Sequence, residues 1–238
     1  MLARSGAQIV IPYRGEESTY THLKVMGDVG QIVALPYSIR DDATIAKAVS
    51  KSNIVVNLLG RRFDTRNFKL EEVHVTAAEK IAKAAKEAKV GRLIHFSSIN
   101  AEEDSPSRWA RTKYAGEEAV KEVFPEATII RPATIFGNQD WFLNRFGTLC
   151  RWLPFVPIVF SDKTKIQPIY VRDVASAFIS ILSDENSFGK TFELGGPETF
   201  TIRQFLDNVI FEYVKVEHGR VLVLPKDVAQ YSPKNYKF

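Results

Sequence analysis

The sequence predicts an α/β fold built on a doubly wound, mostly parallel sheet, and three observations lead to this class. Short β-branched runs alternate with segments of helical periodicity along nearly the whole chain, which is the pattern of a parallel sheet with helices on both faces. The 238 residues suffice for one large domain with a substantial core. The 45% apolar and 25% charged residues are the proportions of an ordinary globular protein.

The expected strands are short, buried runs that end at small or turn-forming residues. The first, QIVIPY at 8–13, is apolar and β-branched, and it follows a short helical tail that Gly6 closes. The run IVVNLL at 54–59 leads into Gly60, and LIHFSS at 93–98 ends in a pair of serines. Further strands are expected at 32–37, 128–131 and 191–194, with extended chain at 165–170.

The expected helices carry the start signals of their class. Asp41 and Asp42 place negative charge at the first turn of a helix, where the helix dipole favours it. Thr201 and Gln204 form the pattern of a capping box. The helices are expected at 41–49, 71–89, 107–123, 138–152, 174–182 and 201–213. In the fourth of these, the aromatic residues Trp141, Phe142, Phe146 and Trp152 fall at roughly helical spacing, which indicates core packing or, as an alternative, a docking face.

Several features exclude other classes of protein. The single cysteine, Cys150, cannot form an internal disulfide. No apolar run approaches the length of about 20 residues that spans a bilayer, and two prolines in the apolar stretch 152–160 favour a loop or docking segment. The net charge of +4 comes from scattered Lys and Arg, so no nucleic-acid partner is expected. The four histidines lack metal-ligand spacing, so no metal site is expected and His95 is expected in the core.

Arg14, at the tip of the first strand, is a candidate for binding the phosphate of a dinucleotide. It would pair with a 2′-phosphate, whereas an acidic residue there would accept from a ribose hydroxyl. A solvated loop arginine is the alternative. A dinucleotide site normally begins with a strand, a glycine-rich turn and a helix, because backbone amides must approach the pyrophosphate. No such turn is present in this sequence, which by itself argues against a nucleotide.

Four stretches downstream of Arg14 occur in a characteristic order. They are Asn57–Gly60 at a strand end, Ser97–Ser98 at the next, Trp109–Lys113 on a helix, and Arg131–Gly137 after another strand. Over nearly the whole chain, this ordered set resembles the extended and atypical short-chain dehydrogenase/reductase families, which have a Rossmann-type fold. Stretches at 22–31, 60–68, 140–144, 167–171 and 189–197 resemble one subgroup, the nucleotide-binding accessory subunits of mitochondrial respiratory complex I.

The resemblance implies a tightly bound NADPH in a structural subunit. Members of the subgroup lie near the junction of the matrix and membrane arms of complex I. The chain is therefore expected to bind other complex I subunits, to support assembly and stability, and to associate peripherally with the matrix side of the mitochondrial inner membrane. The cofactor-binding residues that the resemblance implies are Arg14, Arg40, Asp41, Leu58, Leu59, Gly60, Ser97, Ser98, Lys113, Pro132, Ala133, Thr134 and Ile135.

The resemblance also implies that the catalytic tyrosine is lost. Active relatives use Ser, Tyr and Lys; Ser97 or Ser98 and Lys113 match, but Trp109 occupies the tyrosine position. An indole N–H only donates and cannot relay a proton, and Tyr114, one residue beyond Lys113, is rotated by about 100° from the productive face of the helix. No catalytic residue is therefore expected. Two alternatives stay open: a working NADP-dependent reductase or sugar-nucleotide epimerase/dehydratase, and an RNA- or partner-binding module that only shares the fold.

The family's sheet order predicts a divided sheet. Its first strand, absent from this sequence, lies between the second and fourth strands, so its loss would leave two strand edges unpaired. We therefore expect that the sequence is a fragment or that the native chain is longer. Residues 1–160 are expected to form the incomplete dinucleotide-binding core, and residues 161–238 to complete the fold and dock to partners. The end, 225–238, is expected to be a loose tail.

Overall fold

The computed structural model describes residues 1–159, 163–212, 215 and 221–224. The chain forms two compact units, of which the first comprises Met1–Pro132 with Ala175–Leu194 and the second comprises Ala133–Val174 with Gly195–Phe238. The chain therefore passes between the units three times. The sequence led us to expect a single passage, near residue 160. The docking role of the carboxyl-terminal part stays a prediction, and its expected tail at 225–238 lies outside the described residues.

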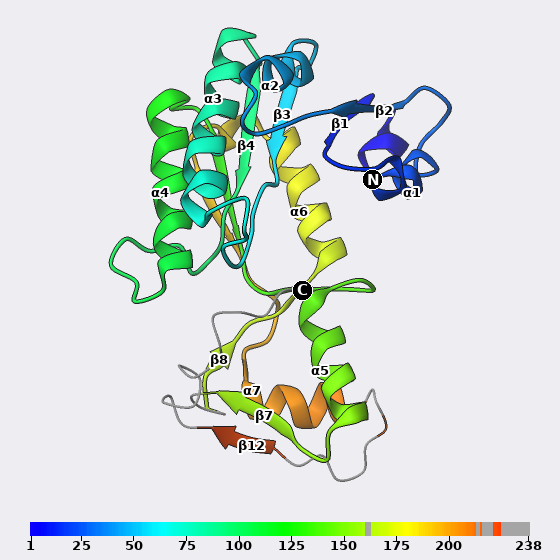
Figure 1. Ribbon diagram of the computed structural model, residues 1–238, viewed down its shortest axis with the longest axis vertical. Helices are drawn as coiled ribbons and strands as arrows, with labels where there is room; N and C mark the ends of the chain where they lie inside the picture. The colour runs from blue at the N-terminus through cyan, green and yellow to red at the C-terminus, as the bar shows by residue number, and fades with distance from the viewer. Residues whose placement is uncertain (160–162, 213–214, 216–220, 225–238) are drawn as a thin grey trace. The chain divides into compact units, whose positions relative to one another are not determined.

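A parallel four-stranded sheet forms the centre of the first unit (Figure 1). Its strands are β3 (Ile54–Asn57), β4 (Arg92–Phe96), β5 (Thr128–Pro132) and β10 (Thr191–Leu194), in the order β10-β5-β4-β3. All three pairings are parallel. This confirms the α/β class that the alternation of strands and helices predicts.

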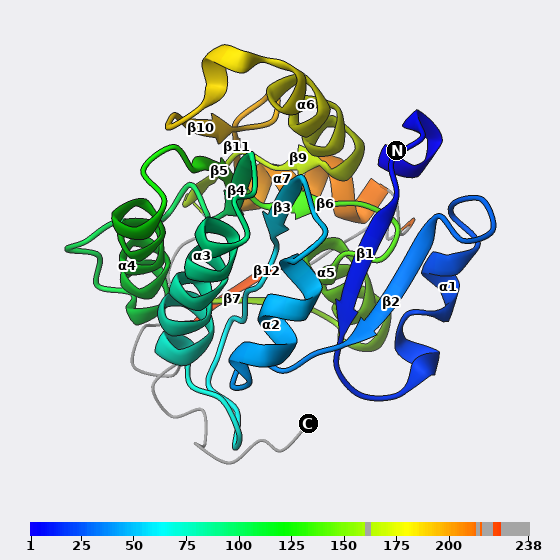
Figure 2. The ribbon, with the colours of Figure 1, turned by 90° about the horizontal axis from the view of Figure 1, so that it is seen from above.

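Helices cover both faces of this sheet (Figure 2). α2 (Asp42–Val49), α3 (Ala77–Glu87) and α4 (Arg108–Val123) lie on one face, and α6 (Val171–Ser183) lies on the other. Successive side chains of β4 point to opposite faces of the sheet. Leu93 packs in a hydrophobic cluster with residues of α3 and α4, whereas Ile94 packs with residues of α6. The single helix expected at 71–89 is divided, because a wider π-helical turn, η3 (Glu72–Thr76), precedes α3.

β1 (Ile9–Tyr13) and β2 (Ile32–Pro36) form a separate two-stranded parallel sheet, which we call the β1–β2 ribbon. Among the described residues, β1 pairs only with β2 and β3 pairs only with β4, so each has one unpaired edge. This is the division that the missing first strand predicts. Leu2 in η1 (Leu2–Ser5) and Tyr37 after β2 attach the ribbon by packing on hydrophobic clusters of the unit. Two short helices, η2 (Glu17–Thr19) and α1 (Thr21–Lys24), connect its strands.

Apart from the start of α6, the described residues of the second unit form two helical segments and three small sheets. The helical segments are α5 (Trp141–Trp152) and α7 (Ile202–Phe205), which continues as the π-helical η5 (Leu206–Phe211). The pairs are β6 (Ile135–Phe136) with β9 (Ile169–Tyr170), β8 (Lys165–Ile166) with β11 (Phe200–Thr201), and β7 (Val156–Val159) with β12 (Val221–Leu224). The capping box of Thr201 and Gln204 is present as expected, although the predicted helix end at 213 lies outside the described residues.

Strand β7 corrects the expectation of a loop at 152–160. Val156 and Ile158 are buried in the hydrophobic cluster of the second unit. The partner strand, β12, follows more than 60 residues later in the chain, so local sequence does not reveal the pairing. Pro157 is tolerated because, among the described residues, this sheet has two strands, and each strand of a two-stranded sheet is an edge strand.

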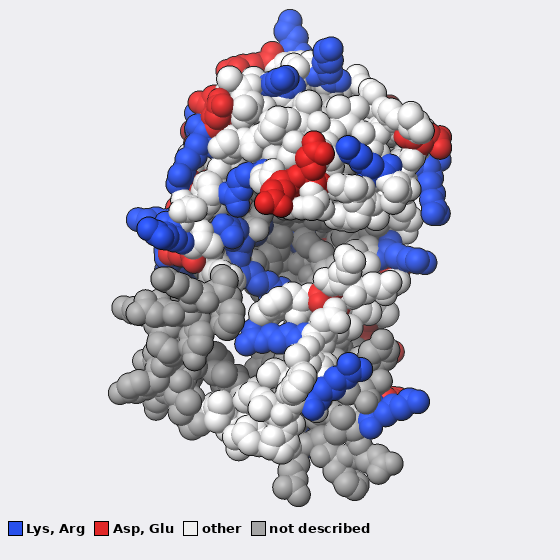
Figure 3. Space-filling model, turned by 45° about the vertical axis from the view of Figure 1, so that its right-hand side comes forward, with Lys and Arg blue, Asp and Glu red and all other residues white. Residues whose placement is uncertain are grey.

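Charged side chains are dispersed over the surface, as their scatter in the sequence indicates. On the face shown in Figure 3, Lys and Arg side chains stand apart from one another, with Asp and Glu between several of them. Exposed pairs such as Lys83 with Glu79 and Lys121 with Glu118 contribute little to stability. Among the described helices, none combines the length and the hydropathy required to cross a membrane.

One buried ion pair joins α4 to the sheet. Glu117 on α4 is fully buried, and its carboxylate accepts from Arg131 on β5, with Nε to Oε1 at 3.0 Å and Nη2 to Oε2 at 2.7 Å. The exposed Glu193 on β10 lies 3.4 Å from the Nη1 of Arg131. Because a buried carboxylate without a partner is costly, Arg131 holds α4 in position on the strands.

Replacing Arg131 by alanine should therefore destabilise the protein strongly. The substitution leaves the Glu117 carboxylate buried and unpaired, which costs about 3–5 kcal/mol of the free energy of unfolding. Glu193→Ala, which removes the exposed partner of the same guanidinium, is the matched control and should cost about 0–1 kcal/mol. Urea denaturation of the two variants measures both, and equal losses would contradict this assignment.

Candidate functional site

Asn57 and His95 position the chain that follows β3. They face each other across the β3–β4 pairing, and the Nδ2 of Asn57 donates to the Nδ1 of His95 at 3.0 Å. Asn57 also accepts through Oδ1 from the amide of Leu59 at 3.0 Å. Burial, with a contribution from Lys113, lowers the pKa of His95 to about 3, so this ring is neutral. The histidine expected in the core is therefore there, and it orients the side chain that turns the backbone toward Gly60.

Lys113 and Gly60 approach each other closely. The ammonium of Lys113, on α4, donates to the carbonyl of Phe96 at 3.3 Å, and the residue is only 7% exposed. A Cβ atom on Gly60 would lie 3.2 Å from the Lys113 Nζ. Burial lowers the pKa of Lys113 to about 8, and Glu117 opposes this shift. The structure thus brings two of the predicted cofactor-binding residues together at the carboxyl edge of the sheet.

The two predicted serines follow β4 directly and differ in their partners. Both are buried. The Oγ of Ser98 accepts from the amide of Asn100 at 3.3 Å. The Oγ of Ser97, next to the carbonyl that Lys113 binds, has no hydrogen-bond partner among the described atoms. A buried hydroxyl without a partner costs free energy, and a polar ligand group at this point would satisfy it.

Trp109 closes a ring of hydrogen bonds around the segment after Gly60. Its indole Nε1 donates to the carbonyl of Arg61 at 2.6 Å, and the amide of Arg61 donates to the Nε2 of His74 at 3.0 Å. The Nδ1 of His74 donates to the hydroxyl of Thr112 at 2.8 Å, which in turn donates to the carbonyl of Trp109 at 2.9 Å. Both peptide groups of Arg61 are thereby fixed to α4 and η3.

The packing of α4 on η3 makes this ring possible. A Cβ atom on Gly116 would overlap the carbonyl oxygen of His74, so only glycine permits this approach. Burial, together with Lys113, lowers the pKa of His74 to about 4. The neutral ring has one nitrogen that accepts from Arg61 and one that donates to Thr112.

Arg14 and Arg40 stack on the same aromatic ring at the end of the β1–β2 ribbon. The guanidinium of Arg14 lies 4.7 Å from the centre of the Phe68 ring, and that of Arg40 lies 4.5 Å from it. Arg40 also pairs with Glu72 at 2.6 Å. Arg14, in contrast, forms no ion pair within the described part of the chain, so its charge is not neutralised by a carboxylate. Sequence reasoning missed Phe68, because no local pattern marks a loop residue as the platform for two distant arginines.

The remaining predicted residues are dispersed. Asp41 is the N-cap of α2 and accepts from the amides of Ala43 and Thr44. Leu58 is 69% exposed, and Leu59 packs on the cluster of α2 and α3. Pro132 accepts from the amide of Ile99. Ala133, Thr134 and Ile135 belong to the second unit, where Thr134 accepts from the amide of Ile169 and Ile135 pairs in β6. Their roles toward a cofactor stay predictions.

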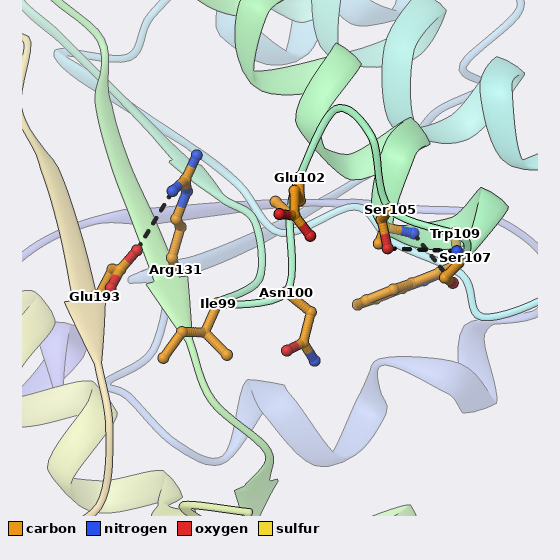
Figure 4. A pocket seen from close by; sticks show the side chains of 10 residues that line it. Ile99, Asn100, Glu102, Ser105, Ser107, Trp109, Arg131 and Glu193 are labelled. Carbon is orange, nitrogen blue, oxygen red and sulfur yellow. Dashed lines mark hydrogen bonds and ion pairs between the residues drawn. The ribbon is translucent and has the colours of Figure 1, made fainter.

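A pocket of about 550 Å³ lies beside Trp109 within the first unit (Figure 4). Arg131 and Glu193 on neighbouring strands form one side, and the loop after β4 with Trp109 forms another. The Ser107 side chain, which caps α4, accepts from the Ala110 amide in this wall. The lining is mostly polar: Ile99, Asn100, Ala101, Glu102, Ser105, Ser107, Trp109, Ala110, Arg131 and Glu193. The sequence did not indicate this pocket, because it depends on the path of the loop.

Comparison with known proteins identifies the fold and the family. The family described as NAD(P)H-binding matches residues 2–150. The structure is similar to that of the enzyme WbmH from Bordetella bronchiseptica in complex with NAD+, with a TM-score of 0.75, 17% identity, and coverage of 94% of this chain and 79% of that one. It is also similar to UDP-glucuronic acid 4-epimerase from Bacillus cereus, with a TM-score of 0.76, 16% identity, and coverage of 98% and 88%. At these identities, the likeness shows the Rossmann-like fold alone.

Curated relatives are far more similar in sequence. The chain is 43% identical over 210 residues to NADH dehydrogenase (ubiquinone) 1 alpha subcomplex subunit 9, mitochondrial, of Dictyostelium discoideum, covering 88% of this chain and 58% of that protein. Identity to the Arabidopsis thaliana protein of the same name is 42% over 231 residues, covering 96% and 57%. For the Mus musculus protein it is 46% over 202 residues, covering 84% and 53%. The chain thus spans a little over half the length of these relatives.

The parallel sheet with helices on both faces and the family match over residues 2–150 both indicate a Rossmann-like, NAD(P)H-binding fold. Identities of 42–46% over most of the chain extend the relationship to one group of respiratory proteins. This chain belongs to the NAD(P)H-binding family and is a homologue of the mitochondrial complex I accessory subunit named alpha subcomplex subunit 9.

Proposed function

We propose that this protein is a non-catalytic, NADPH-binding accessory subunit of mitochondrial respiratory complex I. The observation that carries the proposal is the hydrogen bonding of Trp109. The resemblance to dehydrogenases assigns the position of this residue to the catalytic tyrosine. Its only polar group already donates to the Arg61 carbonyl. An indole N–H neither accepts a proton nor titrates in the useful range. The side chain at this position therefore positions a loop and cannot transfer a proton to a substrate.

The residues around Trp109 fit a bound nicotinamide dinucleotide. Lys113 would hold the ribose with its ammonium, and the unpartnered Ser97 hydroxyl would gain a polar partner. Gly60 leaves room next to Lys113 that a side chain would fill. NADPH, when bound, would act as a structural ligand and would stabilise the folded state by mass action. The glycine-rich turn that cradles a pyrophosphate is not part of this sequence, so the proposal concerns the ribose and 2′-phosphate ends of the cofactor.

The proposed preference for NADPH rests on Arg14. Phe68 holds the Arg14 guanidinium by a cation–π contact, while Glu72 engages the neighbouring Arg40. An arginine that forms no ion pair with the described carboxylates suits a phosphate dianion, since the planar guanidinium can donate two parallel hydrogen bonds to it.

The role in complex I is proposed from the relatives. Homologues from a slime mould, a plant and a mammal all carry the name of the alpha subcomplex subunit 9. We propose that this chain likewise binds other subunits of complex I on the matrix side of the inner membrane, where it associates peripherally with the bilayer. There it would stabilise the junction of the matrix and membrane arms and support assembly.

A working NADP-dependent reductase is the second candidate. The buried Lys113, the two serines after β4 and the polar pocket beside Trp109 favour it. It requires a proton donor other than Trp109, and Tyr114, the neighbouring phenol, is rotated away by about 100° on α4.

NADPH should raise the melting temperature of the full-length protein more than NADH does at equal concentration. Only NADPH carries the 2′-phosphate that Arg14 would bind. Arg14→Gln should remove this difference, whereas Arg4→Gln, at an exposed arginine of η1, should preserve it. Thermal unfolding followed by fluorescence measures the shift. A wild-type protein with no preference, or a preference that survives Arg14→Gln, would contradict the role of Arg14.

The protein should co-migrate with the intact respiratory complex on a native gel and should not consume NADPH with carbonyl substrates. Co-migration follows from the proposed subunit role. The absence of turnover follows because the indole N–H of Trp109 already donates to the Arg61 carbonyl and cannot transfer a proton. The assay compares the wild-type protein with Lys113→Ala. Sustained NADPH oxidation that Lys113→Ala abolishes, by a protein that migrates apart from the complex, would establish the reductase and overturn the proposal.

Mild acid should destabilise the protein through His74 and His95. Their folded pKa values, about 4 and about 3, lie below the value of about 6.5 in an unfolded chain. The unfolded state therefore binds more protons in this window. The stabilisation is complete above about pH 6.5 and decreases as the pH falls toward the folded values.

Thermal unfolding between about pH 7 and pH 5 isolates this effect, because most carboxylates titrate below that range. His74→Gln should make the pH dependence shallower, since glutamine does not titrate. His22→Gln, at an exposed histidine of α1, is the control for replacing a histidine outside the core. An unchanged slope in both His74→Gln and His95→Gln would show that neither histidine is linked to stability in this way.

A further inference from the structure

The outward face of α5 carries two tryptophans in one line. At about 100° per residue, positions 141, 145, 148 and 152 fall within about 60° around the helix axis. Trp141, Arg145, Thr148 and Trp152 therefore form a single row, which we call the tryptophan stripe. All four side chains are exposed, and Trp141 and Trp152 are 53% and 82% exposed.

The inner face of the same helix already has its partners. Phe142 and Phe146 pack on the hydrophobic cluster of the second unit, and Phe142 also stacks with Phe205. The sequence left core packing and docking open for the four aromatic residues of this helix. The structure divides them, because the phenylalanines point inward and the tryptophans lie on the exposed side. Tryptophan is among the most buried side chains on average, so two exposed tryptophans in register indicate a binding surface.

The charge that α5 itself carries is positive, although the acidic Asp140 caps its start. From Trp141 to Val159 the chain contains Arg145 and Arg151 and no acidic residue. The Arg145 guanidinium lies 4.6 Å from the centre of the Trp141 ring, and Arg151 is exposed. Two further apolar side chains, Leu153 and Phe155, follow the helix and are 39% and 38% exposed. Tryptophan, arginine and large apolar residues on one face are the composition of helices that lie in the headgroup region of a membrane.

The geometry matches a flat surface. Trp141 and Trp152 are eleven residues apart, which is about 16 Å along the helix. Both indoles reach one plane together only when the helix axis lies parallel to that plane. A bilayer surface provides such a plane, an apolar zone for the indoles and, with anionic lipids, charges that complement both arginines.

We propose that the tryptophan stripe of α5 is the face through which this protein rests on an anionic phospholipid bilayer. The proposal builds on the peripheral membrane association of the proposed function and names the residues that make the contact. The indoles insert at the level of the headgroups, and Arg145 and Arg151 pair with lipid phosphates.

Vesicle binding by the full chain tests this directly. The protein should sediment with vesicles of phosphatidylcholine and phosphatidylglycerol, much less with phosphatidylcholine alone, and less at high salt. The variant Trp141→Ala/Trp152→Ala should bind on the order of tenfold more weakly. The matched control is Val25→Ser/Val29→Ser, which removes two apolar side chains that are 84% and 107% exposed in the first unit. It should bind as the wild type does, and melting curves show whether each variant is folded.

A second variant isolates the charges. Arg145→Glu/Arg151→Glu keeps both indoles, so it should lose the preference for anionic vesicles while melting at the wild-type temperature. Binding that survives Trp141→Ala/Trp152→Ala, or that falls equally in the valine control, would overturn the proposal. So would a chain that ignores anionic vesicles but loses self-association or subunit binding in the tryptophan variant, because the stripe would then be a protein interface.

The two proposals can fail separately. The preference for NADPH over NADH is tested at Arg14, which belongs to the first unit, whereas α5 belongs to the second. A chain that binds anionic vesicles through the stripe but shows no NADPH shift would overturn the proposed cofactor alone. A chain with the NADPH shift but no vesicle binding would overturn the lipid contact alone.

Discussion

The close contact between α4 and η3 is the constraint on which the candidate site depends. Gly116 allows α4 to approach until it touches the backbone of His74, and any larger residue would push the helix away. At this separation, His74 reaches both Thr112 on α4 and the amide of Arg61. Trp109 then reaches the Arg61 carbonyl from the other side. A single small residue therefore fixes the loop after β3 relative to the helix that carries Lys113.

The polar groups behind this contact are held in defined charge states. Glu117 keeps its charge because Arg131 donates to both of its oxygens. The two buried histidines are held neutral by burial and by the neighbouring Lys113. Lys113 itself has a lowered pKa of about 8, so it carries most of its charge near neutral pH. The site thus offers one cation and one unpartnered hydroxyl.

The fold was largely predictable from the sequence because its signals are local. Apolar runs marked β1, β3, β4 and β5, and Asp41 and Thr201 marked the helix starts that they cap. The divided sheet also followed, although from the resemblance and its strand order, since no local pattern shows which strand is missing. β7 was missed because its partner, β12, is distant in the chain and because Pro157 resembles a strand breaker.

The candidate site was predictable only in part. Gly60 and Lys113, which were each expected to bind the cofactor, lie close together, because strand ends and helix faces follow from periodicity. Phe68 and His74 were not anticipated, since their roles depend on a loop and a π-helical turn that bring distant residues together. The sequence could not decide which aromatic residues of α5 face the core. That choice depends on how the helix is rotated on the cluster of the second unit.

The weak attachment of the β1–β2 ribbon affects the order in which parts of the first unit unfold locally. None of its residues is buried, whereas four of the five residues of β4 are. Side-chain packing by Leu2 and Tyr37 attaches it to the unit, without backbone pairing to the four-stranded sheet. The ribbon should therefore behave as a separate foldon, whose amides exchange with solvent long before those of β4 and β5. Arg14 lies at the end of the ribbon, so the charge proposed to bind the phosphate is carried by this foldon, and binding of the ligand there would be coupled to the closing of the foldon.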